Sequence, residues 1–172
     1  MKKLLYPAAT LVSVVVADQA TKAWAISYLT DKPQVEVLGK FFMFTLVYNE
    51  GGAMGTNFGS PAYYLVSSVL ILGVLLYYIY SHRNQLSLTL PLAFISGGAI
   101  GNIIDRLQLG RVVDFLDVDF FDLNLFGYTL ERWWTFNIAD AAISCSIIFL
   151  LIRILFFPHG RPHETPNDTQ QV

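Results

Sequence analysis

The sequence predicts an all-α membrane protein with four transmembrane helices, and three observations lead to that prediction. Of the 172 residues, 54% are apolar and only 14% are charged, whereas about 25% of the residues of a soluble domain are charged. The mean hydropathy is +0.49. Four windows reach the roughly 20 apolar residues that a helix needs to cross a bilayer, and they are Leu4–Ile26, Ala62–Tyr80, Leu86–Leu107 and Asn137–Phe157.

The composition also argues against several classes of protein. The apolar content excludes a disordered chain. The net charge is −2, and without a long basic run nucleic acid is not an expected partner. The single cysteine, Cys145, permits neither an internal disulfide nor a cysteine metal cluster. We expect no metal, no cofactor and no obligate protein partner.

The first window also resembles a cleavable signal peptide. Two lysines precede its apolar run, and small residues follow near Ala17 and Ala20. Cleavage there would waste Asp18, which lies four residues before Lys22 and can pair with it on one side of a helix. We therefore expect a retained transmembrane helix.

The second and third windows carry typical signs of membrane helices. Tyrosines flank the second window at both ends, where amphipathic rings meet lipid headgroups. The third contains Gly97, Gly98 and Gly101, and the spacing of the first and last permits close helix packing.

Two long connections separate the windows, Ser27–Pro61 and Gln108–Phe136. Val35–Tyr48 in the first is rich in Val, Phe and Thr, with a possible turn at Gly39 and Lys40, and predicts short strands at the membrane surface. We expect one transmembrane domain over residues 1–157 and a polar, disordered, cytoplasmic tail over 158–172.

With four spans, both long connections lie on the same side of the membrane. Lysines and arginines number five on the other side and six on this one, so the positive-inside rule does not decide the orientation. Lys2 and Lys3 before the first span favour a cytoplasmic N-terminus.

Ionisable side chains inside a membrane are costly and indicate function. Arg106 cannot lose its proton, so it would brace a carboxylate or backbone carbonyls. The Asp18–Lys22 pair has an equally good structural interpretation, as an ion pair that ties helices together. Five such residues lie toward the side of the long connections, namely Asp18, Lys22, Asp105, Arg106 and Asp140.

Asp114 and Asp140 are expected at the same depth, and two carboxylates that share a proton can activate water. Asp117, Asp119 and Asp122 are rivals for the place of Asp114. A calcium site at the first two of these rivals would lack the usual turn glycine. Two other functions remain possible at this point, that of a small proton-coupled transporter and that of a structural membrane subunit.

The sequence resembles lipoprotein signal peptidase (signal peptidase II), a family of bacterial membrane aspartyl endopeptidases. The resemblance covers residues 4–157 and rests on five motifs that occur in the same order as in the family. They are Asp18-Gln19-Ala20-Thr21-Lys22, Tyr48-Asn49-Glu50-Gly51-Gly52-Ala53, Gly97-Gly98-Ala99-Ile100-Gly101-Asn102-Ile103-Ile104-Asp105-Arg106, Val112-Val113-Asp114-Phe115 and Phe136-Asn137-Ile138-Ala139-Asp140.

The resemblance implies that Asp114 and Asp140 are the catalytic dyad. Other family positions that support the site or position substrate fall on Asp18, Lys22, Asn49, Gly51, Gly98, Asn102, Asp105, Arg106 and Asn137. It further implies four transmembrane helices with a small β-sheet cradle and a short helix on the periplasmic side of the bacterial inner membrane, with both termini cytoplasmic. The implied substrate is a prolipoprotein whose cysteine carries diacylglyceryl, cleaved before that cysteine with its acyl chains in membrane lipid.

The sequence departs from the family pattern in two places. Asn49-Glu50-Gly51-Gly52-Ala53-Met54 stands where the family usually has Asn-x-Gly-Ala-Ala-Phe. The segment between Asp114 and Asp140 is longer than usual, and we expect its aromatic residues to anchor at the interface rather than to form a flap. These are Phe120, Phe121, Trp133 and Trp134.

Overall fold

The computed structural model describes residues 2–32, 34–52, 60–119, 123–125, 128–130 and 134–156. It contains the four predicted helices, each long and apolar enough to cross a membrane, with bounds within three residues of the predicted ones. They are α1 (Lys2–Leu29), α2 (Pro61–Ser81), α3 (Leu86–Leu109) and α4 (Ile138–Phe156). The expected tail over 158–172 lies outside the described residues.

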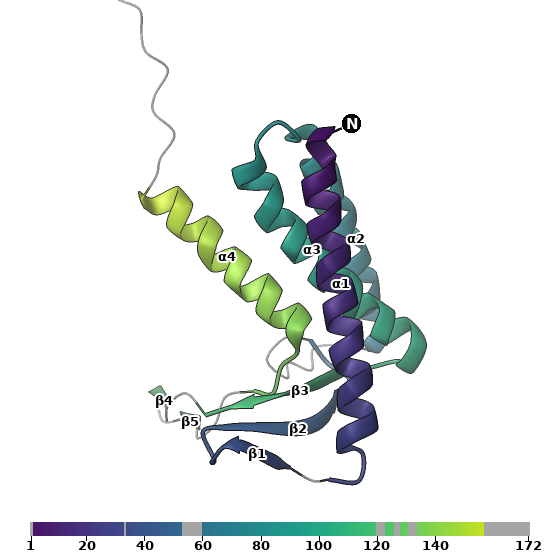
Figure 1. The fold of residues 1–172 in the computed structure, drawn as a ribbon, viewed down its shortest axis with the longest axis vertical. Coiled ribbons are helices and arrows are strands. Elements are labelled where there is room, and N and C mark those ends of the chain that lie inside the picture. Colours follow the sequence, from purple (N-terminus) through teal and green to yellow (C-terminus); the bar gives the residue numbers. More distant parts are fainter. Residues whose placement is uncertain are drawn as a thin grey trace, which may run out of the picture.

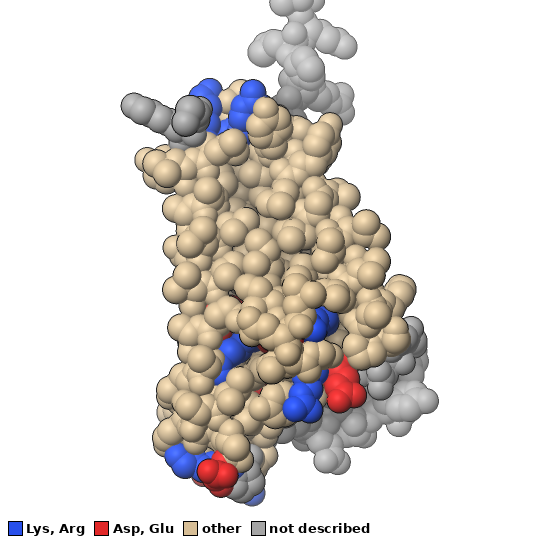
Figure 2. All heavy atoms as spheres, turned by 90° about the vertical axis from the view of Figure 1, so that its right-hand side faces the viewer, with Lys and Arg blue, Asp and Glu red and all other residues tan. Residues whose placement is uncertain are grey.

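Helix α3 is the centre of the bundle, because α1, α2 and α4 all pack against it (Figure 1). On the face drawn in Figure 2, a broad band without charged side chains separates the charges at the end that carries the N-terminus from those at the end that carries the sheet. Such a band is what a protein presents to the hydrocarbon of a bilayer.

The glycines of α3 permit this packing. A Cβ atom added at Gly97 would lie 2.8 Å from the carbonyl oxygen of Leu11 and 2.8 Å from Cβ of Val14, both in α1. One at Gly98 would lie 2.5 Å from the carbonyl oxygen of Ala139, in α4. The packing interpretation of these glycines is therefore confirmed.

We expect Gly97→Ala to lower the free energy of unfolding by about 1–3 kcal/mol, since α1 or α3 must shift to admit the methyl group. Gly73→Ala in α2 is the matched control, because a Cβ there meets nothing within 4 Å. Thermal unfolding in detergent micelles measures both variants. Equal melting temperatures would contradict the close approach of α1 and α3.

A three-stranded antiparallel sheet lies at the end of the bundle opposite the N-terminus, with strand order β1-β2-β3 (Figure 1). Its strands are β1 (Val35–Leu38), β2 (Phe42–Asn49) and β3 (Val112–Val118). The predicted turn is present, with Gly39 at a φ of 53°, a value that suits glycine.

The sheet agrees with the cradle that the resemblance implied, although no strand was predicted from the residues at β3. A second, two-stranded sheet pairs β4 (Leu123–Leu125) with β5 (Tyr128–Leu130). The implied short helix is not among the elements of the described residues. Of the four aromatic residues expected at the interface, only Trp134 is described, and its side chain is exposed.

Candidate active site

Asp114 lies in β3, and its side chain is 1% exposed. Its carboxylate accepts two hydrogen bonds from amides, one from Nδ2 of Asn137 at 2.7 Å and one from Nδ2 of Asn49 at 3.2 Å. Buried apolar residues on either side, Val113 and Phe115, hold this part of β3 in place. The candidate carboxylate is therefore fixed from two sides and removed from bulk water.

Asp140 lies in the first turn of α4, where a helix N-terminus favours an ionised carboxylate. Its Oδ1 accepts a hydrogen bond from Nδ2 of Asn102 at 2.9 Å, and its Oδ2 accepts one from the backbone N–H of Asn137 at 3.4 Å. The backbone N–H of Asp140 in turn donates to Oδ1 of Asn137 at 2.9 Å. This reciprocal pair is a capping box, which begins α4 and orients Asp140 at the same time.

Asn137 joins the two candidate carboxylates. Its side-chain amide donates to Asp114 while its backbone N–H donates to Asp140, and the residue is fully buried. Burial and then the charge of Asp140 raise the pKa of Asp114 to about 7, against the hydrogen bonds from Asn49 and Asn137. A proton is therefore available to this pair of carboxylates near neutral pH.

Lys22 lies beneath this pair and is 2% exposed. Its Nζ atom is 2.8 Å from Oδ2 of Asp18 and 2.8 Å from Oδ2 of Asp105. It also donates to Oδ1 of Asn102 at 2.9 Å. Because Lys22 occupies the amide oxygen of Asn102, the NH₂ group of that amide is directed at Asp140.

The two carboxylates around Lys22 also hold the backbone of the site. Oδ1 of Asp18 accepts a hydrogen bond from the backbone N–H of Ala139 at 2.9 Å, and Oδ2 of Asp105 accepts one from Val113 at 3.0 Å. The first bond ties α1 to the start of α4, and the second ties α3 to β3. The predicted Asp18–Lys22 pair is confirmed, and it belongs to a larger network.

Gln19 belongs to this network, although sequence reasoning did not select it. Its Nε2 atom donates to Oδ1 of Asp105 at 2.9 Å and to the carbonyl oxygen of Gly101 at 3.2 Å. The signal available in the sequence was its place beside Asp18 in a membrane helix, where an amide side chain needs polar partners.

The remaining predicted site residues lie around this core. Arg106 donates from Nη2 to the carbonyl oxygen of Gly51 at 3.2 Å, so it braces a backbone carbonyl as predicted. The backbone N–H of Gly51 donates to Oδ1 of Asn49 at 2.9 Å, which orients the amide that contacts Asp114. Gly98 does not contact the carboxylates but lets α3 approach α4.

The rivals of Asp114 lie elsewhere. Asp117 is three residues further along β3, so its side chain projects from the other face of the strand, where it accepts a hydrogen bond from Oγ1 of Thr45 at 2.7 Å. The backbone N–H of Asp119 donates to the carbonyl oxygen of Phe41, and Asp122 lies outside the described residues. In the described part of the chain, no group of three His, Cys, Asp or Glu side chains could hold a metal ion.

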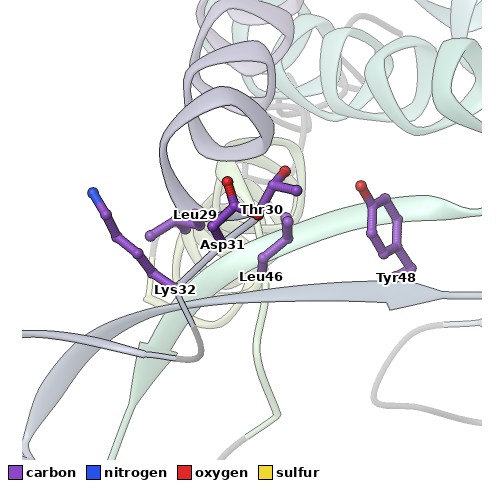
Figure 3. Close-up of a pocket in the computed structure, with 6 residues that line it drawn as sticks. All are labelled: Leu29, Thr30, Asp31, Lys32, Leu46 and Tyr48. Atoms are coloured by element: carbon purple, nitrogen blue, oxygen red, sulfur yellow. The ribbon is translucent and has the colours of Figure 1, made fainter.

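A cavity of about 460 Å³ lies beside the end of α1 (Figure 3). Leu46 and Tyr48 of β2 point into it (Figure 3), whereas Val47, between them in sequence, is the register partner of Asp114. The cavity therefore lies on the other side of the sheet from the candidate carboxylates. It is lined by Leu29, Thr30, Asp31, Lys32, Leu46 and Tyr48.

Comparisons with known proteins identify a family and a similar fold. Residues 10–156 match the family model described as signal peptidase (SPase) II. The lipoprotein signal peptidase of Pelodictyon phaeoclathratiforme is 37% identical over 161 residues, which cover 92% of this chain and 94% of that protein. That of Chlorobium phaeobacteroides strain BS1 is 41% identical and covers 81% of this chain and 89% of that protein. A solved bacterial membrane enzyme is similar in fold, with a TM-score of 0.72, 32% identity and 87% of each chain covered.

Proposed function

Because the chain belongs to the signal peptidase II family, we propose that it removes signal peptides from prolipoproteins with Asp114 and Asp140 as an aspartyl catalytic dyad. The chain is a multi-pass membrane protease. The observation that carries the dyad is the contact of the fully buried Asn137 with both carboxylates, that of the buried Asp114 and that of Asp140, at the sheet end of the helices. The family matches provide no support for the transporter alternative.

The proposed hydrolysis needs one ionised and one protonated carboxyl group. The ionised one takes a proton from water, whose oxygen attacks the scissile carbonyl carbon, while the protonated one donates its proton to the carbonyl oxygen. When the tetrahedral intermediate collapses, the carbon–nitrogen bond breaks, the leaving amine takes the proton that the base had removed from water, and one hydroxyl of the intermediate returns its proton to the other carboxylate as the carbonyl forms again. The dyad titrates as a unit, so the roles of base and acid belong to the pair.

The surrounding residues would position this dyad. Asn49, Asn102 and Asn137 donate hydrogen bonds to its carboxylates, and Arg106 with Gly51 orients Asn49. Lys22 with Asp18 and Asp105 holds the helices and β3 in register around it. In hydrocarbon, an unfolded stretch of substrate also needs polar partners for its amide groups, and the same asparagines and Arg106 could supply them.

We propose that the substrate cysteine carries diacylglyceryl and that cleavage occurs just before it. Asp114 lies in β3 and Asp140 in the first turn of α4, where the helices meet the sheet (Figure 1), so acyl chains can stay in lipid while the peptide reaches the carboxylates. In a bacterial inner membrane with cytoplasmic termini, this end faces the periplasm. Residues 1–157 would form the peptidase domain, and 158–172 a cytoplasmic tail.

The pH dependence of cleavage tests the proposed function. Cleavage should fall as the pH rises through about 7, because Asp114 then loses the proton that the dyad requires. The hydrogen bond from Asn49 lowers the pKa of Asp114, so Asn49→Ala should raise that pKa. The alkaline limb of the pH profile, where the rate falls, should then move to higher pH by about one pH unit. The measurement is the pH profile of kcat for a purified, diacylglyceryl-modified prolipoprotein.

Glu50→Ala is the matched control, since Glu50 is the exposed residue that directly follows Asn49 at the end of β2. Its limb should coincide with that of the wild type. A precursor without diacylglyceryl should remain uncut under the same conditions. An alkaline limb that Asn49→Ala leaves in place would contradict the assignment of Asp114 to the dyad.

A further inference from the structure

Strand β2 contains one more residue than β3 over the same length of the sheet. Phe44 pairs with Leu116, and the next pair in the register is Val47 with Asp114. Three steps along β2 thus correspond to two steps along β3. Thr45 and Leu46 together face Phe115, which makes this a β-bulge.

The bulge decides where the side chain of Asn49 points. If the same sequence paired regularly from Phe44 onward, with no bulge, Leu46 and not Val47 would lie opposite Asp114. A slip of one residue moves every side chain of a strand to the other face, so Asn49 would point away from the dyad. With the bulge, Asn49 lies on the face of Asp114, and its Nδ2 atom is 3.2 Å from Oδ2 of that residue.

A partly buried hydrogen bond joins the bulge to β3. Oγ1 of Thr45, a bulged residue, donates to Oδ2 of Asp117 at 2.7 Å. Asp117 is 3% exposed, and Met43, its register partner in β2, is 5% exposed. The bond therefore ties the irregular part of β2 to the regular part of β3, and its acceptor lies in a buried environment, which strengthens a hydrogen bond.

We propose that Thr45 and Asp117 are positioning residues for the hydrolysis: their hydrogen bond holds the bulge of β2 in the register that keeps Asn49 on Asp114. The inference rests on the proposed function, in which Asp114 is a member of the dyad. Neither residue touches the reacting atoms. Both act through the register of two strands.

The first test compares Thr45→Val, which removes the hydroxyl and keeps the branched shape, with Thr45→Ser, which keeps the donor. Thr45→Val should lower kcat by about tenfold or more, since small misplacements of catalytic groups are costly. Its alkaline limb should move to higher pH, in the direction expected for Asn49→Ala, because Asp114 loses the hydrogen bond from Asn49 that lowers its pKa. The charged groups that face Asp114 from α4, α1 and α3, namely Asp140, Lys22 and Arg106, stay the same. Thr45→Ser should resemble the wild type in both respects.

The second test places Thr45→Val in the Asn49→Ala background. If the hydroxyl acts through Asn49, the limb should not move further. A wild-type profile for Thr45→Val, or a further shift in the Asn49→Ala background, would overturn the proposal. If Thr45→Val does not fold, the double variant Thr45→Val with Asp117→Leu removes both polar partners of the bond, and the same limb shift is expected of it. Activity of Asp114→Asn would instead contradict the proposed function itself, so the two failures are distinguishable.

Discussion

Asp114→Asn and Asp140→Asn are each expected to lower the rate of prolipoprotein cleavage by about 10³-fold or more, since each removes a group that transfers a proton in the transition state. Asparagine has nearly the shape of aspartate and keeps an acceptor for the amide of Asn137 or Asn102. Both variants should therefore fold, and the loss should appear in kcat. Single-turnover cleavage of a diacylglyceryl-modified precursor measures it.

The double variant should be about as inactive as either single variant, because residues that act as a unit do not contribute additively. Asp119→Asn is the control, since Asp119 was a rival for the place of Asp114 in the sequence. It should retain wild-type cleavage. Near-normal turnover by Asp114→Asn or Asp140→Asn would remove the dyad from the mechanism, and loss of cleavage in Asp119→Asn would reopen its assignment.

The helices could be predicted closely because their signal is local. Each of the four windows is about as long as a bilayer is thick, and charged or turn-forming residues bound it. The polar residues of the site could be selected for a related reason. An ionisable group such as Asp18 or Lys22 is so costly in hydrocarbon that its presence alone indicates a partner or a function.

Strand β3 was not predicted from the residues because its pattern does not alternate. Val112, Val113, Asp114 and Phe115 are all buried, so the strand lacks the polar outer face by which strands in antiparallel sheets are recognised. Its partner β2 lies more than 60 residues earlier in the chain. The bulge in β2 is a matter of register between these two strands, and no local propensity determines it.

The ion pair between Lys22 and Asp105 could not be predicted from the sequence either. Asp18 lies one helical turn from Lys22 and could be paired by spacing, whereas Asp105 reaches Lys22 only because α1 crosses α3 closely. That crossing occurs at Gly101, where an added Cβ would collide with the carboxylate of Asp18. The motif showed which residues matter, but the contacts between them depend on how the helices pack.

Lys22→Met should cause the largest loss of stability among the substitutions considered. It removes the ammonium group that lies 2.8 Å from both Asp18 and Asp105 and leaves two carboxylates buried without that cation. Breaking a buried ion pair from one side costs about 3–5 kcal/mol, so the variant should unfold at a much lower temperature or fail to accumulate. Lys32→Met, at an exposed lysine beyond the end of α1, should stay within about 1 kcal/mol of the wild type, since it loses only an exposed cation–π contact with Tyr28.

The triple variant Lys22→Met, Asp18→Asn, Asp105→Asn distinguishes the effect of this charged network on stability from its effect on cleavage. With no buried charge left in the network, most of the stability should return, as replacing a whole buried ion pair is often neutral. Cleavage should stay impaired, because the amide oxygen of Asn102 loses the shorter of its two hydrogen bonds, that from Lys22, and keeps only the one from Asn137 to direct its NH₂ group at Asp140. The charge of Lys22 also lowers the pKa of Asp114, so the residual activity should show an alkaline limb at higher pH. Full activity in the triple variant would mean that the network only holds the helices together.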